Sequence, residues 1–146
     1  MIGIDTQLLV YAARGETDWH AVALRVLVDL AESGRPWAIP WPCVHEFIST
    51  VTRPRLFNPP NTPEQAFAAV TAWMESPSLV LLHEGSTHFA RLRELAFAAK
   101  IVGARIHDAR IAALCLENGV QEFWTADRDF SAFPSLRVRN PLVAYQ

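Results

Sequence analysis

Short apolar segments alternate with helical patterns along this chain, and this alternation constrains the fold more than any other feature of the sequence. The candidate strands are residues 2–4, 37–39, 79–82 and 123–125, with a weaker one over 137–139. Helical patterns fill the intervals between them. A strand–helix–strand order of this kind favours a parallel sheet with helices on both faces. We therefore expect an α/β fold.

Start and stop signals mark the expected helices. Pro42 suits the first helical position of one helix, and residues 62–64 (Thr-Pro-Glu) provide an N-cap, a first-turn proline and an early acid for the next. Gly34 and Gly119 follow helical patterns and are typical stops. Helices are expected over residues 18–33, from 42 to about 53, from 63 onward, over 87–98 and over 106–118.

Length and composition indicate one domain without a membrane span. The 146 residues match a single domain, which we expect over residues 1–146. Ile-Gly-Ile-Asp follows Met1 directly, without the basic start and apolar run of a signal peptide, so we expect a cytoplasmic protein. No segment approaches the roughly 18 uninterrupted apolar residues of a membrane span. Cys43 and Cys115 are too few and too far apart for a disulfide framework, and we expect both in the core.

Two acids directly follow apolar segments. Asp5 closes Met-Ile-Gly-Ile, and Asp127 follows Glu-Phe-Trp-Thr-Ala. In an open parallel sheet, ligands bind beyond the carboxyl ends of the strands, so chemistry is expected at these positions. Either acid alone is more simply explained as a helix cap or a turn residue. Their occurrence together favours a functional site.

Two further acids lie in expected helices. Asp108 shares a helix face with Ile111 and Cys115, and a carboxylate aimed at a core is costly unless it is paired or bound to metal. The alternative for Asp108 is a favourable interaction with the dipole of its helix in the first turn. Glu46 lies on the face of its helix opposite the apolar residues, so the pattern alone predicts a solvated side chain.

A site built from four carboxylates suits a hard cation such as Mg²⁺ or Mn²⁺ better than zinc. The HExxH, GxGxxG, Walker and GxSxG motifs are all absent from the sequence, so zinc-protease, nucleotide-cofactor and serine-hydrolase functions have no support. The net charge of −2 argues against a nucleic-acid partner. Two bound divalent cations would change that charge to −2 + 4 = +2, and bound ions often dominate the local field.

The order of these motifs resembles the PIN domain, in particular the VapC-type toxins of bacterial toxin–antitoxin pairs, over essentially the whole chain. The opening Ile-Gly-Ile-Asp-Thr resembles the first strand and first acid of that family, and residues 43–47 (Cys-Val-His-Glu-Phe) resemble its glutamate-bearing helix. The most specific similarity is C-terminal and looks like mycobacterial members of the family: Arg-Ile-His-Asp-Ala-Arg-Ile-Ala-Ala over 105–113, Trp-Thr-Ala-Asp-Arg-Asp-Phe over 124–130 and Arg-Asn-Pro-Leu over 139–142.

The resemblance implies a PIN-like three-layer α/β/α fold with a central parallel sheet in the order 3-2-1-4-5. It also implies a metal-dependent endoribonuclease that uses activated water and leaves a 5′-phosphate and a 3′-hydroxyl. The implied catalytic residues, which hold Mg²⁺ or Mn²⁺, are Asp5, Glu46, Asp108 and Asp127. The hydroxyl of Thr125 supports this site, and Asp129 is a fifth candidate ligand. A VapB-like antitoxin as inhibitor and a homodimer are further expectations from the resemblance.

Other functions remain open from the sequence. The same acidic pocket could serve a DNA-directed nuclease or a phosphatase through loop variation. A non-catalytic binding module is a third possibility, which the presence of all four acids disfavours. Aromatic residues near the expected element ends could dock a partner, although core packing is their more common role. These residues are Trp19, Trp41, Phe57 and Trp73.

Overall fold

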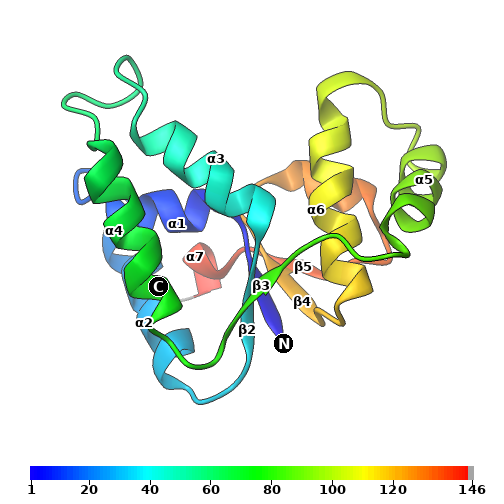
Figure 1. The fold of residues 1–146 in the computed structure, drawn as a ribbon, viewed down its shortest axis with the longest axis horizontal. Coiled ribbons are helices and arrows are strands. Elements are labelled where there is room, and N and C mark those ends of the chain that lie inside the picture. The colour runs from blue at the N-terminus through cyan, green and yellow to red at the C-terminus, as the bar shows by residue number, and fades with distance from the viewer. Residues whose placement is uncertain (145–146) are drawn as a thin grey trace.

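The computed structural model describes residues 1–144 and has a five-stranded parallel sheet at its centre (Figure 1). The strands are β1 (Ile2–Ile4), β2 (Trp37–Pro40), β3 (Leu79–Leu82), β4 (Glu122–Trp124) and β5 (Val138–Arg139). Their order is β3-β2-β1-β4-β5, which confirms the expected order. Ile2 of β1 pairs with Trp37 of β2 on one side and with Glu122 of β4 on the other. β1 is therefore the central strand, and all the carboxyl ends meet at one edge.

Helices cover both faces of the sheet, as the alternating pattern predicts. The helices α5 and α6 lie on one side of the sheet, and α1, α2, α3 and α4 lie on the other (Figure 1). No helix within residues 1–144 is both long and apolar enough to cross a membrane. The helices are α1 (Thr6–Ala13), α2 (His20–Glu32), α3 (Trp41–Val51), α4 (Pro63–Met74), α5 (His88–Ala98), α6 (Ile106–Glu117) and α7 (Pro141–Ala144), with 3₁₀ turns η1 (Gly103–Arg105) and η2 (Arg128–Ala132).

The observed boundaries differ from the expected ones by a few residues. α2 begins at His20 and not at residue 18, because a turn precedes it in which the Thr17 hydroxyl donates to the carbonyl of Arg14 (2.7 Å). α3 begins at Trp41, so Pro42 is its second residue. Strand β4 is one residue shorter at its carboxyl end than expected, which places position 125 in the turn beyond the strand.

The helix stop and start signals are confirmed. Gly34 and Gly119 end α2 and α6 with φ angles of 72° and 71°, in the left-handed region that glycine adopts without strain. Thr62 caps α4 through reciprocal bonds with Gln65: its hydroxyl accepts from the Gln65 backbone, and the Gln65 side chain accepts from the Thr62 backbone.

The central strand packs tightly beneath α6. A Cβ atom added to Gly3 would lie 3.1 Å from a ring carbon of Phe123 and 3.2 Å from Val120, so a side chain there would displace its neighbours. Cys43 and Cys115 are completely buried near this strand, which confirms their expected place in the core. Because β1 is fixed on both edges and on this face, the residue that follows it has a well-defined position.

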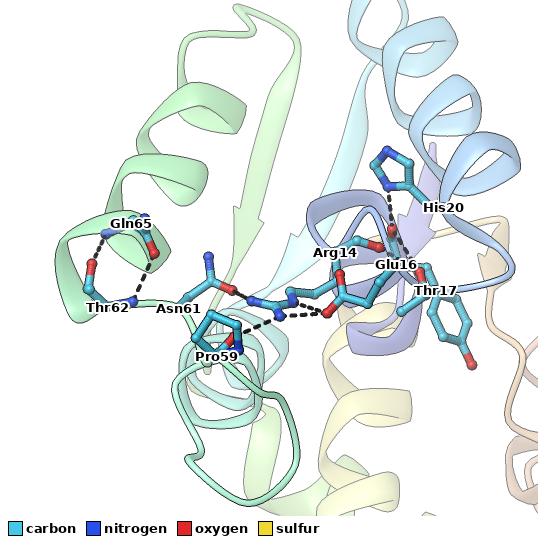
Figure 2. A network of polar contacts seen from close by, with 9 residues as sticks. Arg14, Glu16, Thr17, His20, Pro59, Asn61, Thr62 and Gln65 are labelled. Carbon is cyan, nitrogen blue, oxygen red and sulfur yellow. Dashed lines mark hydrogen bonds and ion pairs between the residues drawn. The ribbon is translucent and has the colours of Figure 1, made fainter.

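Arg14, just after α1, ties the loop between α3 and α4 to the body of the protein (Figure 2). Its Nη1 donates to Oδ1 of Asn61 (2.7 Å), and its Nη2 donates to the carbonyl of Pro59 (2.9 Å). Its Nε donates to Glu16 (2.8 Å), and the guanidinium lies 4.6 Å from the centre of the Phe57 ring. This one side chain thereby holds the loop through several contacts.

Candidate metal-binding active site

Asp5 lies at the carboxyl end of the central strand β1 and caps α1. One carboxylate oxygen, Oδ1, accepts from the backbone N–H of Thr6 (2.8 Å), and the other, Oδ2, accepts from the hydroxyl of Thr125 (2.6 Å). The thiol of Cys43 lies 3.7 Å from Oδ1. The residue is only 5% exposed, so these contacts hold the carboxylate in one orientation.

The surroundings of Asp5 oppose its ionisation. Burial is the largest cause and raises its pKa from 3.8 to about 6, against the hydrogen bonds from Thr125 and Thr6, which lower it. The negative charges of Glu46 and Asp127 raise it further. A cation placed among these carboxylates would favour the charged form of Asp5 and relieve their repulsion.

Thr6 links Asp5 to Glu46. Its backbone N–H donates to Asp5, and its hydroxyl donates to Oε2 of Glu46 (2.9 Å). Glu46 is exposed, in agreement with the helical pattern, but its position in the middle of α3 brings its carboxylate to the edge where β1 ends. Thr6 was not predicted as a site residue, although its place as a hydroxyl residue directly after the strand-end acid was an available signal.

Asp108, Asp127 and Asp129 form the tightest acidic group among the described residues. One carboxylate oxygen from each lies within 4.8 Å of the other two. Asp127 caps η2 by accepting from the backbone of Asp129 (2.9 Å), and its own backbone N–H donates to the hydroxyl of Thr125 (2.9 Å). Because that hydroxyl also donates to Asp5, Thr125 connects the two strand-end acids.

Asp108 enters this group from the first turn of α6, where it is half-buried. Its pKa lies above its usual value because of burial and then the charges of Asp127 and Asp129, while Arg105 opposes the shift. The carboxylate accepts no hydrogen bond within residues 1–144, unlike Asp5 and Asp127. The free-energy cost of the charged Asp108 carboxylate is therefore electrostatic, and no capping hydrogen bond offsets this cost.

All five candidate acids gather at the same edge of the sheet, but they do not form one equidistant cluster. Asp129, which the sequence ranks last, belongs to the tight group, whereas Asp5 and Glu46 sit beside it around Thr6. The charge of Glu46 raises the pKa of both Asp5 and Asp108, so the two parts lie close enough to interact electrostatically.

A pocket of about 390 Å³ opens between α3 and α6 and contains two of these acids, Glu46 and Asp108. The neighbouring residues on its wall include His45, Ser49 and Arg110. His45 and His107 share this pocket, each directly before an acid, and no sequence motif predicted that they would meet.

A parallel sheet in this order, with acids gathered beyond its central strands, is the architecture of a PIN domain, and the PIN domain family profile matches residues 2–136. The chain belongs to the PIN domain family, within its group of VapC ribonucleases. The relative Ribonuclease VapC43 of Mycobacterium tuberculosis is 37% identical over 142 residues, which cover 97% of this chain and 96% of the relative.

Solved structures share the fold at lower sequence identity. VapBC2 from Rickettsia felis, bound to a promoter DNA fragment, superposes with a TM-score of 0.68 at 20% identity and covers 96% of this chain and 98% of its own. VapC20 of Mycobacterium tuberculosis, described as a sarcin–ricin loop cleaving toxin, has a TM-score of 0.67 at 19% identity and covers 90% of this chain and 94% of its own.

Proposed function

We propose that this protein is an endoribonuclease toxin that depends on Mg²⁺ or Mn²⁺ and acts in the cytoplasm. The observation that carries the proposal is the meeting of Asp108, Asp127 and Asp129 within 4.8 Å, next to Asp5 with its raised pKa. The relatives that carry the name VapC ribonuclease support RNA as the substrate.

The donor set fits a hard divalent cation, because every candidate ligand is a carboxylate. Oxygens that share one Mg²⁺ at about 2.1 Å lie up to about 4.2 Å apart, so small side-chain rotations bring the three aspartates into range. The proposed ligands are Asp5, Glu46, Asp108, Asp127 and Asp129. The acids lie in two neighbouring groups, the three aspartates and the pair Asp5 and Glu46, and each group is a candidate subsite for one cation.

When bound, the cation supplies Lewis acidity at the scissile phosphate and an acidic water. The chain itself fixes the carboxylates: Thr125 orients both Asp5 and Asp127, and Thr6 orients Glu46. In the overall reaction, water adds to phosphorus, the bond to the 3′-oxygen breaks, and that oxygen takes up a proton. The products are a 5′-phosphate and a 3′-hydroxyl.

The function is tested with purified, partner-free protein, a labelled single-stranded RNA, the DNA of the same sequence and a phosphomonoester. We expect cleavage of the RNA with Mg²⁺ or Mn²⁺, loss of cleavage in EDTA, and loss in Asp5→Asn. Asp29→Asn, at an exposed acid on α2, is the matched control and should cleave normally. Activity that survives chelation or the Asp5 substitution contradicts the site, and a preference for DNA or the phosphomonoester contradicts the substrate.

We also propose a VapB-like antitoxin as the inhibiting partner and a homodimer as the toxin's assembly. An apolar groove of about 370 Å³ between α1, α2 and α4 suits a partner segment, and Leu24 and Val28 on its wall are more than two-fifths exposed. Trp73 also lines this groove while packing against the core, so one of the four aromatic candidates lies where a partner could reach it. The structural neighbour VapBC2 supports a partner of this kind.

A further inference from the structure

The pocket between α3 and α6 contains groups that the proposed hydrolysis does not use. We propose that this pocket holds one unpaired nucleobase of the RNA, next to the phosphodiester that is cut, and that Ser49 and Arg110 recognise the edge of that base. The inference rests on the nuclease function proposed above and deepens it, because it assigns the selection of the cleavage position to named side chains.

The position of the pocket makes it a neighbour of the acidic site. Two helices line it: His45 and Ser49 lie one turn apart on α3, while His107 and Arg110 lie one turn apart on α6. Glu46 and Asp108 belong both to this pocket and to the acidic site. A base seated in the pocket would therefore belong to a nucleotide directly beside the scissile phosphate.

The size and wall of the pocket suit a base. Its volume of about 390 Å³ lies in the range of about 300–1,000 Å³ that small organic ligands occupy in proteins. The exposed ring of His45 lies beside the indole of Trp41, with ring centres 5.9 Å apart and a tilt of 31°. A ring supported in this way can offer a flat face for stacking, which is how proteins hold unpaired RNA bases.

Arg110 is held as a directional donor on the opposite wall. Glu84, in the loop after β3, accepts from Nε and Nη2 of Arg110 (2.8 and 2.5 Å). Within residues 1–144 no hydrogen bond uses Nη1, so this nitrogen can donate into the pocket. Arginine donors recognise acceptor atoms on base edges, with guanine O6 and N7 as the most frequent partners.

The charges in the pocket favour a base over a second phosphate. Glu84 compensates the charge of Arg110, and the proposed cations would take up the charges of Glu46 and Asp108, so the wall of the pocket has no unpaired positive charge to attract another phosphate. A neutral base needs no such charge and can still form hydrogen bonds with Ser49 and Arg110. The occupant that fits the chemistry is therefore a base with acceptor atoms on its edge, such as guanine.

The test is the sequencing of cleavage ends from a randomised single-stranded RNA digested by the full chain with Mg²⁺ or Mn²⁺. We expect one position beside the cut to be enriched in one base. Arg110→Ala and Ser49→Ala should each weaken that preference by about tenfold, the equivalent of about 1.4 kcal/mol for a lost base contact. Arg93→Ala, at an exposed arginine on α5 outside the pocket, is the matched control and should keep the full preference.

A binding measurement separates recognition from cleavage. Short RNAs that carry the preferred or a disfavoured base are titrated with Asp5→Asn protein, followed by fluorescence anisotropy, with and without the added Arg110→Ala change. We expect Arg110→Ala to reduce affinity about tenfold for the preferred base and little for the other.

The failures are distinguishable. If the unchanged protein cuts no RNA, the function on which the inference rests is overturned. If it cuts RNA but has no base preference, or one that Arg110→Ala and Ser49→Ala leave intact, the nuclease stands and the base pocket is wrong. A loss confined to the affinity for a protein partner also overturns the base pocket.

Discussion

Single residues at the acidic site have a local structural role, and they also carry an electrostatic cost of close, partly buried negative charges that metal binding would relieve. Asp5 caps α1 and Asp127 caps η2, as the simpler interpretation of the sequence predicted. The same two side chains also belong to the acidic site, so the two interpretations do not exclude each other. Sequence position identified both acids because each follows a strand. It could not identify the proximity of Glu46 to Thr6, since this depends on how α3 packs beyond the end of β1.

The raised pKa of Asp5 makes the stability of the metal-free protein depend on pH. The pKa of Asp5 is 3.8 in the unfolded chain and about 6 in the folded protein. At a pH between these two values, the folded protein keeps a proton on Asp5 that the unfolded chain has released. Stability contributed by this group therefore falls as the pH rises from about 4 to about 6. A pKa shift of this size limits the stability that is lost over this pH range to about 3 kcal/mol. We expect Asp5→Asn to be the more stable protein at pH 7, with the difference vanishing near pH 4.

Urea denaturation in EDTA at both pH values measures this difference. Asp29→Asn is the control, because that acid is exposed and should show no pH-dependent gain. Equal or lower stability of Asp5→Asn at pH 7 would show that the bonds from Thr6 and Thr125 outweigh the cost of burying the charge.

Asp108→Ala should leave the melting temperature of the metal-free protein unchanged or raise it. The carboxylate is half-buried beside Asp127 and Asp129 and accepts no hydrogen bond within residues 1–144, so its removal relieves repulsion without the loss of a cap. The same change should abolish the stabilisation that Mn²⁺ gives the unchanged protein. Thermal melts with EDTA and with Mn²⁺ measure both effects, and a clear fall in EDTA would identify Asp108 as a structural residue.

At the scale of elements, the contacts of Arg14 predict how the loop before α4 is held. Arg14→Ala removes bonds to Asn61, Pro59 and Glu16 and uncovers the ring of Phe57, and the Arg14 side chain is only 12% exposed. Charged hydrogen bonds of this kind contribute about 1.5–3 kcal/mol, so we expect a loss of about 2 kcal/mol in the free energy of unfolding. Chemical denaturation of Arg14→Ala measures the loss.

Arg93→Ala provides the comparison for this experiment, since Arg93 is exposed on α5 and should change stability by less than about 0.5 kcal/mol. Amide hydrogen exchange adds a local measurement: the loop of residues 52–61 should exchange faster in Arg14→Ala, while β1 should not. A loss spread evenly over the sheet would contradict a local anchor.

The sequence predicted the type and order of the elements better than their ends. Apolar runs and glycine stops located every strand and most helices, because both depend on local periodicity. The end of β4 and the start of α3 were displaced by one residue each, since these ends are decided by pairing with neighbouring strands and by packing. The pocket between α3 and α6 was not predicted, because no local pattern records which two helices meet.

At the scale of the whole molecule, the strand order came from the resemblance to PIN domains, since the spacing of strands along the chain indicates only a parallel sheet. The order places acids from distant segments at one edge, and this gives the proposed metal and the proposed antitoxin a common target. An arginine or lysine of the partner could pair with the carboxylates in place of the cation. We expect the partner to bind less tightly as Mg²⁺ is raised.

Titration calorimetry or interferometry with the copurified partner, over a series of Mg²⁺ concentrations, measures this competition. Val28→Glu in the apolar groove should weaken binding, whereas Val102→Glu, at an exposed position outside the groove, should not. Affinity that is indifferent both to Mg²⁺ and to Asp5→Asn would defeat the idea that the partner reaches the acids.

The hydrogen bond between Asp5 and Thr125 joins residues 120 positions apart in the chain. During synthesis on a ribosome, Asp5 is translated well before its partners on β4 and in the following turn, one of which lies 120 positions later in the chain. The central strand has one open edge until then, and the acids on α3 and α6 have no common frame. A nuclease built in this way cannot complete its cutting site until the segment from β4 to η2 has been translated and has left the ribosome.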